Sequence, residues 1–245
     1  MCRVAARAAA VLLVVALSAE RPASAESGQT GADDPRYLLF ASTDLWRHGG
    51  FAHGGGVWSP EGVNHEGFAL KVTFGGGAYR YISGALGNVE VTGRQIAAAV
   101  LPGWRFKNEG LIVTVFAGLD LQHHRLSPDD PSAGLRGGYA GLRAAAELWY
   151  QPNMNMMLAA EGSATTIGPS YSARGAIGWR IFDSFFLGPE IAAFAHDDNY
   201  RQARAGVHIT ALNAGILEWS ASLGLASDSD KRTGAYGRLG LLTRQ

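Results

Sequence analysis

The stretch RQARAGVHITALNAGILEWSASLGLA, residues 201–226, decides the fold. Its side chains alternate in character on both sides of a turn at Asn213–Gly215. The polar or small set comprises Gln202, Arg204, Gly206, His208, Thr210, Glu218, Ser220, Ser222 and Gly224. The apolar set comprises Ala203, Ala205, Val207, Ile209, Ala211, Leu217, Trp219, Ala221, Leu223 and Leu225. Because a period of two places successive side chains on opposite faces of a strand, the stretch predicts a β-hairpin with one polar and one apolar face.

The length of this alternation indicates a membrane. Each half of the hairpin alternates for about ten residues, and a tilted strand needs roughly 9–11 residues to cross a bilayer. We therefore predict an all-β chain that folds as an up-and-down antiparallel transmembrane β-barrel, with lipid outside and a polar lumen inside. Closure of such a barrel leaves no strand edge exposed to lipid.

Similar alternation recurs along the chain and predicts twelve strands, an even number typical of single-chain bacterial barrels. The predicted strands cover residues 37–46, 51–58, 67–81, 89–106, 111–122, 136–150, 156–166, 171–182, 185–195, 201–212, 216–226 and 233–243. Two segments leave an alternative open. Ala144–Trp149 is rich in good helix formers. The last residues, Leu241–Gln245, lack the terminal aromatic residue that barrel assembly signals typically carry, so the pairing of the closing strand stays open.

The N-terminus predicts export. Arg3 and Arg7 precede a short apolar run and the small-residue site Ala23–Ala25, a pattern typical of a secretory signal peptide over residues 1–25. Residues 26–36 are predicted to be a periplasmic lead-in, and residues 37–245 the outer-membrane barrel. The single cysteine, Cys2, lies in the signal peptide, so the mature chain has no thiol chemistry. Basic and acidic residues balance at 21 each, which gives no reason to expect a nucleic-acid partner.

The predicted inward-facing positions collect most of the ionisable side chains of the strands. These are Asp44, Lys71, Arg105, Asp120, Arg143, Glu147, Glu161, Arg174, Arg180, Glu190, Arg204, His208, Glu218 and Arg238. An unpaired charge inside a small barrel is costly, so these groups are expected to pair. Two interpretations stay open: a packed interior held by arginine–carboxylate pairs, or a lumen that conducts or binds a polar solute.

Tryptophan placement gives the strands a direction. Trp58, Trp104, Trp149 and Trp179 lie near the ends of even-numbered predicted strands, and Trp219 lies near the start of the eleventh. An even barrel places all five at the level of its termini, in the periplasmic half. Tryptophan is enriched at membrane interfaces, so these residues are predicted to form an aromatic girdle.

Enzymatic chemistry finds little support in the sequence. The histidines expected toward the extracellular side are His48, His53, His123, His124 and His196. His123–His124 beside Asp129–Asp130 could bind a metal or transfer protons, but a hydrated loop is the simpler interpretation. Neither Gly-x-Ser-x-Gly nor His-Glu-x-x-His occurs. We predict no catalytic, cofactor-binding or metal-binding residues, and a protein that is not an enzyme.

Several short motifs carry a family resemblance. They are Asp44–Arg47, Ser83–Val91, Ser127–Asp130, Tyr171–Arg174 and Tyr200–Gln202. In order and spacing the chain from about residue 37 to 244 resembles the cellulose biosynthesis protein BcsS family. The resemblance implies an outer-membrane protein that works with bacterial cellulose synthase components, and it implies no catalytic residues.

The resemblance turns the barrel hypothesis into two mechanisms. The barrel could be a narrow channel for exported polysaccharide, with Phe116, Phe194 and Tyr236 as inward rings along its path. It could instead be a scaffold or anchor whose segments Leu126–Leu135 and Ser227–Arg232 bind polysaccharide or a partner. Its expected partners are outer-membrane lipids, cellulose or another glucan, and other secretion components. An outer-membrane lipid-modifying enzyme and a general small-solute channel are the alternatives.

Overall fold

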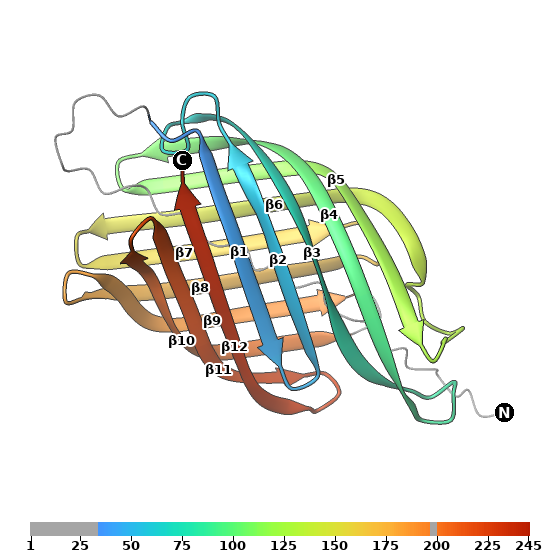
Figure 1. Ribbon diagram of the computed structural model, residues 1–245. Coiled ribbons are helices and arrows are strands. Elements are labelled where there is room, and N and C mark those ends of the chain that lie inside the picture. The colour runs from blue at the N-terminus through green and yellow to red at the C-terminus, as the bar shows by residue number, and fades with distance from the viewer. Residues whose placement is uncertain (1–33, 197–199) are drawn as a thin grey trace.

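A computed structural model describes residues 34–196 and 200–245. In these ranges the chain forms a closed antiparallel barrel of 12 strands in up-and-down order, which confirms the predicted fold (Figure 1). The strands are β1 (Tyr37–Trp46), β2 (Gly49–Trp58), β3 (Gly67–Ser83), β4 (Val89–Asn108), β5 (Leu111–Ser127), β6 (Gly137–Asn153), β7 (Met156–Thr165), β8 (Ser170–Ile181), β9 (Phe185–His196), β10 (Arg201–Ala214), β11 (Leu217–Asp228) and β12 (Thr233–Arg244). The predicted signal peptide and most of the predicted lead-in lie outside the described residues.

The segment with helical propensity is a strand. Ala144–Trp149 lies inside β6 and pairs with β5 on one side and β7 on the other. Within residues 34–196 and 200–245, no helix is long and apolar enough to span a membrane.

The closing strand is paired along its whole length despite its lack of a terminal aromatic residue. β1 and β12 run antiparallel from the pair Leu38 and Arg244 to the pair Trp46 and Tyr236. The amide of Tyr37 donates to the carbonyl of Gln245 at 2.9 Å, and the amide of Gln245 donates back at 2.8 Å. Every strand therefore has two neighbours, and lipid meets no open edge.

The two faces of the wall differ as the alternation predicts. In β1, the inward Leu38 is 2% exposed and the outward Leu39 is 44% exposed. The outward face of the barrel carries exposed apolar side chains, including Phe74, Ile96, Leu119, Leu142, Ile191, Val207 and Leu223. The inward face carries buried polar and charged groups, so the membrane solvates the apolar face and the protein itself must solvate the polar one.

A bulge in β10 overturns one outward assignment. The register between β10 and β11 shifts between Ile209 and Leu212, so Thr210 and Ala211 together oppose Ser220. Ala211 has a φ of 63° and is 0% exposed, although the alternation placed it on the lipid face. Two residues opposite one put neighbouring side chains on the same side, which a strict period of two does not anticipate.

Strands β3 to β6 are longer than predicted. β5 continues to Ser127, so His123 and His124 lie in a strand and not in a hydrated loop. His124 is 3% exposed inside the barrel, and His123 faces out. The polar composition of this stretch suggested a loop, but its alternation persists because the strand extends beyond the apolar band. Figure 1 shows the ends of β3, β4 and β5 that lie away from the C-terminus projecting past β1 and β2.

A charge on the outer face tests the orientation of the wall. Val207 is 56% exposed and lies opposite Leu223. We expect Val207→Arg to lower the free energy of unfolding in lipid vesicles by about 2–4 kcal/mol, the cost of a lipid-facing arginine near the midplane. Ala203→Arg, nearer the strand end, should cost about 0–1 kcal/mol. Denaturant titrations that find Val207→Arg as stable as the wild type would mean that the faces of β10 are interchanged.

Candidate functional site

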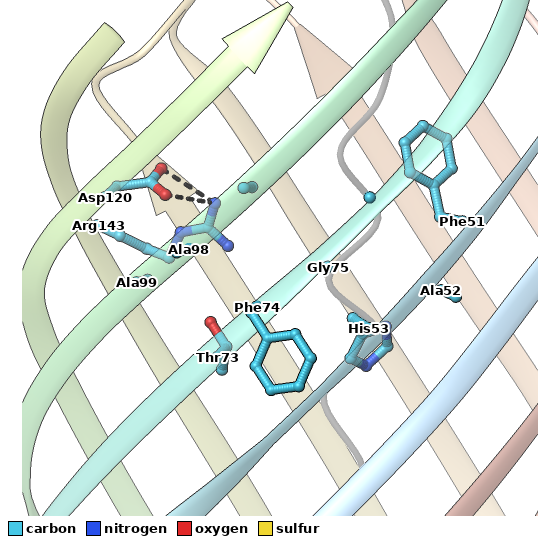
Figure 2. A pocket seen from close by; sticks show the side chains of 12 residues that line it. Phe51, Ala52, His53, Thr73, Phe74, Gly75, Ala98, Ala99, Asp120 and Arg143 are labelled. Atoms are coloured by element: carbon cyan, nitrogen blue, oxygen red, sulfur yellow. Dashed lines mark hydrogen bonds and ion pairs between the residues drawn. The ribbon is translucent and has the colours of Figure 1, made fainter. Parts of the chain in front are cut away.

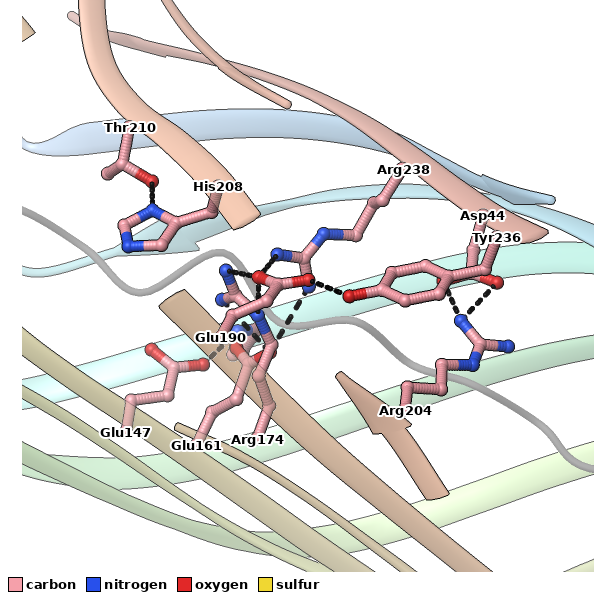
Figure 3. A network of polar contacts seen from close by, with 11 residues as sticks. Asp44, Glu147, Glu161, Arg174, Glu190, Arg204, His208, Thr210, Tyr236 and Arg238 are labelled. Atoms are coloured by element: carbon pink, nitrogen blue, oxygen red, sulfur yellow. Dashed lines mark hydrogen bonds and ion pairs between the residues drawn. The ribbon is translucent and has the colours of Figure 1, made fainter. Parts of the chain in front are cut away.

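The centre of the lumen holds a compact group of charges, here called the central network: Glu161, Arg174, Glu190 and Arg238 (Figure 3). Arg174 donates to Glu190 Oε2 from Nη2 at 2.6 Å and from Nε at 2.9 Å. Arg238 Nη2 donates to the same oxygen at 3.0 Å. Glu161 Oε1 lies 3.5 Å from Arg174 and 3.8 Å from Arg238. Two cations and two carboxylates, at most 10% exposed, thus neutralise one another.

A second pair is tied to the central network through Tyr236. The Tyr236 hydroxyl donates to Glu190 Oε1 at 2.9 Å. Arg204 lies 5.1 Å from the Tyr236 ring centroid and 4.8 Å from that of Phe194. The Arg204 Nη1 atom donates to both oxygens of Asp44, at 2.9 and 2.7 Å. Because Asp44 is on β1 and Arg204 on β10, the pair joins strands that are not neighbours in the sheet.

Further pairs involve the side chains of β3, β5 and β6. Lys71 of β3 donates to Glu147 of β6, and its ammonium lies 4.9 Å from the Phe40 centroid and 5.5 Å from that of Phe116. Arg143 Nη2 donates to Asp120 at 3.0 and 3.1 Å. The remaining acceptor capacity of Asp120 is used by Thr165 at 2.6 Å and Gln122 at 2.9 Å.

Four of the predicted inward residues form their bonds closer to the end of the barrel where β1 begins and β12 ends. Arg105 donates to Thr114 Oγ1 at 3.2 Å and to a backbone carbonyl. Glu218 accepts from Arg244 at 3.2 Å. Arg180 donates to the Met154 carbonyl and stacks over Phe186, and His208 lies 3.0 Å from Thr210 Oγ1 and 3.2 Å from the Ile177 carbonyl. All fourteen predicted inward residues therefore have polar partners, and that of Arg180 is a carbonyl in the exposed turn between β6 and β7.

The sequence interpretation missed two of these partners. Arg244 and Thr165 bond to the predicted residues but were not assigned to the lumen. Arg244 has the same parity in β12 as Arg238, so the alternation would have found it had the strand been extended by one residue.

The tryptophans divide between the two faces. Trp58, Trp104 and Trp179 are 37%, 46% and 50% exposed on the outer wall, toward the end where β1 begins and β12 ends. Trp219 also faces out and is partly exposed. Trp149 was expected beside them but is 1% exposed inside the barrel, with its ring centroid 6.2 Å from that of Phe186.

The placement of Trp149 has a simple cause. In β6 it shares the parity of the inward Arg143 and Glu147. The outward neighbour Tyr150, 40% exposed, occupies the girdle position instead.

The lumen rings need small residues in the wall. A Cβ atom on Gly206 would lie 2.6 Å from the hydroxyl of Tyr236, and one on Gly224 would lie 2.8 Å from its ring. A Cβ atom on Gly93 would lie 1.9 Å from the ring of Tyr79. Glycine is therefore required where an aromatic ring lies against the backbone of the facing strand.

The histidines expected toward the extracellular side are spread over several elements. His53 and His124 lie in the lumen walls on β2 and β5, His123 faces out and His48 lies in the turn after β1. The side chain of His196 lies outside the described part of the molecule. Over the residues that the structure describes, no three His, Cys, Asp or Glu side chains group as a metal site.

A small cavity lies beside the Asp120–Arg143 pair (Figure 2). It measures about 20 Å³ and is lined by His53, Thr73, Phe74 and small residues of β2, β3 and β4. This is room for about one water molecule, not for a sugar ring.

The segment between β5 and β6 is pinned by a buried carboxylate. Asp130 accepts from the Tyr81 hydroxyl at 3.1 Å, and from the amide and hydroxyl of Ser132 at 3.0 and 2.6 Å. Burial would raise the pKa of Asp130, but hydrogen bonds from Ser132, Ser83 and Tyr81 outweigh it and lower the pKa to about 2. The ionised carboxylate thus holds residues 128–136 against the inner wall.

Breaking the Asp44–Arg204 pair should be costly. Arg204→Met leaves a buried carboxylate without its cation, so we expect the free energy of unfolding to fall by about 3–5 kcal/mol. The double variant Asp44→Leu/Arg204→Met should recover most of this loss in the same vesicle titration. Arg80→Met, at the exposed pair Arg80–Glu90 (3.9 Å), is the control and should cost less than about 1 kcal/mol. Equal losses in the single and double variants would contradict a mutual dependence of the two charges.

The segment at Asp130 should open in acid. Because its folded pKa of about 2 lies below the ordinary value of 3.8, ionised Asp130 stabilises the segment above pH 4, and this is lost as pH falls from 4 to 2. Amide exchange in residues 128–136, corrected for intrinsic rates, should rise about tenfold per pH unit in that interval. Asp129→Asn, at the 74% exposed neighbour, should keep this dependence, and Asp130→Asn should abolish it. A flat wild-type profile would show that the carboxylate does not hold the segment.

Comparisons with known proteins agree with the fold. The COG4313 outer membrane channel from Pseudomonas putida F1 has 9% identity and a TM-score of 0.53, over 90% of this chain and 99% of that one. The KdgM porin has 11% identity and a TM-score of 0.43, over 84% and 98%. LpxR from Salmonella typhimurium has 10% identity and a TM-score of 0.46, over 84% and 99%. At 9% identity the likeness to the COG4313 channel concerns the fold alone.

The family assignment comes from sequence. None of the curated proteins matches the chain. The model of the family described as cellulose biosynthesis protein BcsS matches residues 38–245, which is nearly the whole barrel. The chain therefore belongs to the BcsS family of cellulose biosynthesis proteins, as a barrel of the bacterial outer membrane.

Proposed function

We propose that this barrel is a closed scaffold or anchor of cellulose biosynthesis, which acts through its mouths and does not pass a glucan through its lumen. The observation that carries the proposal is the filled cross-section at its centre. Glu147 lies beside the central network, because it is the direct cross-strand partner of Glu161, and Lys71 of β3 donates to it from another part of the wall. The side chains of Lys71 and Glu147 are 1% and 4% exposed, so water does not reach them.

Layers of rings support a closed interior on either side of these charges. Trp149 and Phe186 pack edge to face and are 1% and 0% exposed. Phe116, Phe194 and Tyr236, the rings expected along a sugar path, are 3%, 7% and 3% exposed. Rings this deeply buried offer little exposed face for a sugar to stack on.

Opening this lumen would be expensive. A glucan wide enough to need the whole cross-section would have to separate the central network or break the Lys71–Glu147 pair. Separating one buried ion pair leaves charges without partners, at a cost of about 3–5 kcal/mol. A binding role at the mouths avoids this cost.

The mouth where β1 ends and β12 begins offers an ordered surface for such a role. Asp228 accepts from the amides of Asp230 and Arg232 at 3.0 and 2.9 Å, and from Arg232 Nε at 2.7 Å. Arg232 lies 5.8 Å from the Trp46 ring centroid, and His48 packs edge-on against that ring. A ring with hydrogen-bond donors beside it suits a sugar or a peptide partner, and the anchored segments 128–136 and 229–232 flank this surface.

Conductance separates the closed scaffold from a channel. We expect the purified wild type in a planar bilayer to give no persistent current. Glu161→Ala/Glu190→Ala/Arg174→Ala/Arg238→Ala removes the central network and should produce open-channel steps, because water enters the vacated volume. Cello-oligosaccharides should not change the wild-type trace. A persistent wild-type current that cello-oligosaccharides block would contradict the proposal and support a glucan channel.

A complementation assay tests the anchoring role itself. A strain lacking the gene should make cellulose but retain less of it at the cell surface, and the wild-type gene should restore retention. Trp46→Ala/Arg232→Ala should fail to restore it, whereas Val207→Ala on the lipid face serves as the matched control and should succeed. Unchanged retention in the deletion strain would contradict a role in cellulose attachment.

A further inference from the structure

The outer wall of β4 and β5 changes from apolar to basic at one level. Toward the last residues of β5, the directly paired residues on the two strands are Ala98 with Leu121, Ile96 with His123, Arg94 with Arg125, and Thr92 with Ser127. Ile96 and Leu121 are 68% and 54% exposed. Arg94 and Arg125 are also exposed, and they alternate with the buried, inward Gln95 and His124. The two arginines are therefore on the outer face of the barrel.

The level of the arginines coincides with the edge of the hydrocarbon layer. Outward residues of β4 are apolar from Phe106 to Ile96. Ten residues of strand at about 3.3 Å each, tilted by about 45°, rise about 23 Å. The apolar band of an outer-membrane barrel is about 25 Å tall. Arg94 and Arg125 thus lie where lipid headgroups begin, on the side of the membrane away from the C-terminus.

The arginine pair lacks a counter-charge in the part of the chain that the structure describes. Side chains at directly opposed positions have Cβ atoms about 5 Å apart, and like charges placed there repel. Neither guanidinium has an ion pair or hydrogen bond to any residue in the ranges 34–196 and 200–245. The nearby exposed cations differ, because Arg80 pairs with Glu90 at 3.9 Å and Arg136 pairs with Asp129 at 3.6 Å.

We propose that Arg94 and Arg125 bind a phosphate group of an anionic lipid in the outer leaflet. Two guanidinium groups can donate in parallel to phosphate oxygens, which also removes their mutual repulsion. The hydroxyls of Thr92 and Ser127, one outward position further from the hydrocarbon, can donate to the same group. Ile96 and Leu121 lie on the hydrocarbon side, where the acyl chains of that lipid run. A phosphorylated lipid satisfies both parts of the surface, and free phosphate satisfies one.

This site does not depend on whether the lumen is open. It is on the outer wall, and the closed-scaffold proposal concerns the interior, so failure of either leaves the other standing.

Lipid binding by the full-length barrel tests the proposal. The folded protein in detergent is titrated with bisphosphorylated lipid A, with the same lipid after removal of its phosphates, or with inorganic phosphate, and bound lipid is counted by native mass spectrometry. We expect bisphosphorylated lipid A to bind at least about tenfold more tightly than the dephosphorylated lipid, with an affinity that falls as salt rises. Arg94→Gln/Arg125→Gln should reduce binding of the phosphorylated lipid to the dephosphorylated level.

Arg201→Gln is the matched control. Arg201 is an exposed, outward arginine at the same end of β10, but its partner in β9 is Ala195 and not a second cation. Its substitution should leave lipid binding unchanged. Heat-modifiable migration verifies the fold of each variant, and the single variants Arg94→Gln and Arg125→Gln replace the double variant if it does not fold. Equal binding of wild type and arginine variants, or of the two lipids, would overturn the proposal. Competition by millimolar inorganic phosphate alone would overturn the lipid as its ligand.

Discussion

A buried charge needs an opposite charge close by, and this requirement connects parts of the barrel that the backbone does not. The hydrogen-bond ladder joins each strand only to its two neighbours. The Asp44–Arg204 and Lys71–Glu147 pairs join β1 to β10 and β3 to β6. Because breaking such a pair exposes both partners to a medium that solvates them poorly, the pairs hold the wall at one diameter. Glycines beside Tyr236 and Tyr79 also keep the wall at this diameter, because they leave room for large rings that fill the space between charges.

The sequence predicts both the barrel and the side chains that point into it, and for the same reason. Alternation is a local property, so the inward position of Lys71, Asp120 or Glu190 follows from the few residues around it. Pairing is not local. Asp44 and Arg204 are 160 residues apart, and their contact depends on closure between β1 and β12, which the C-terminal residues left open. No periodicity in either segment could have identified the partner.

The residues placed wrongly mark where a simple alternation ends. Ala211 turns inward at a bulge, where two residues oppose one. Trp149 was assigned by the preference of tryptophan for interfaces, although its parity with Glu147 put it inside. His124 was taken for a loop residue because its neighbours are polar, although polar residues are expected on a strand that leaves the apolar band. In the last two cases residue type was given more weight than register, and register was the better guide.

The inner and outer faces of the wall treat charge in opposite ways, and this contrast locates function. Inside, cations such as Arg174, Arg204 and Arg143 are matched by carboxylates and neutral donors, which leaves little for a passing solute to bind. Outside, Arg94 and Arg125 lie opposite each other with no carboxylate partner among residues 34–196 and 200–245, in a position open to an external anion. The paired charges of the lumen therefore argue for a structural role, and the two facing arginines of the outer wall argue for contact with the membrane.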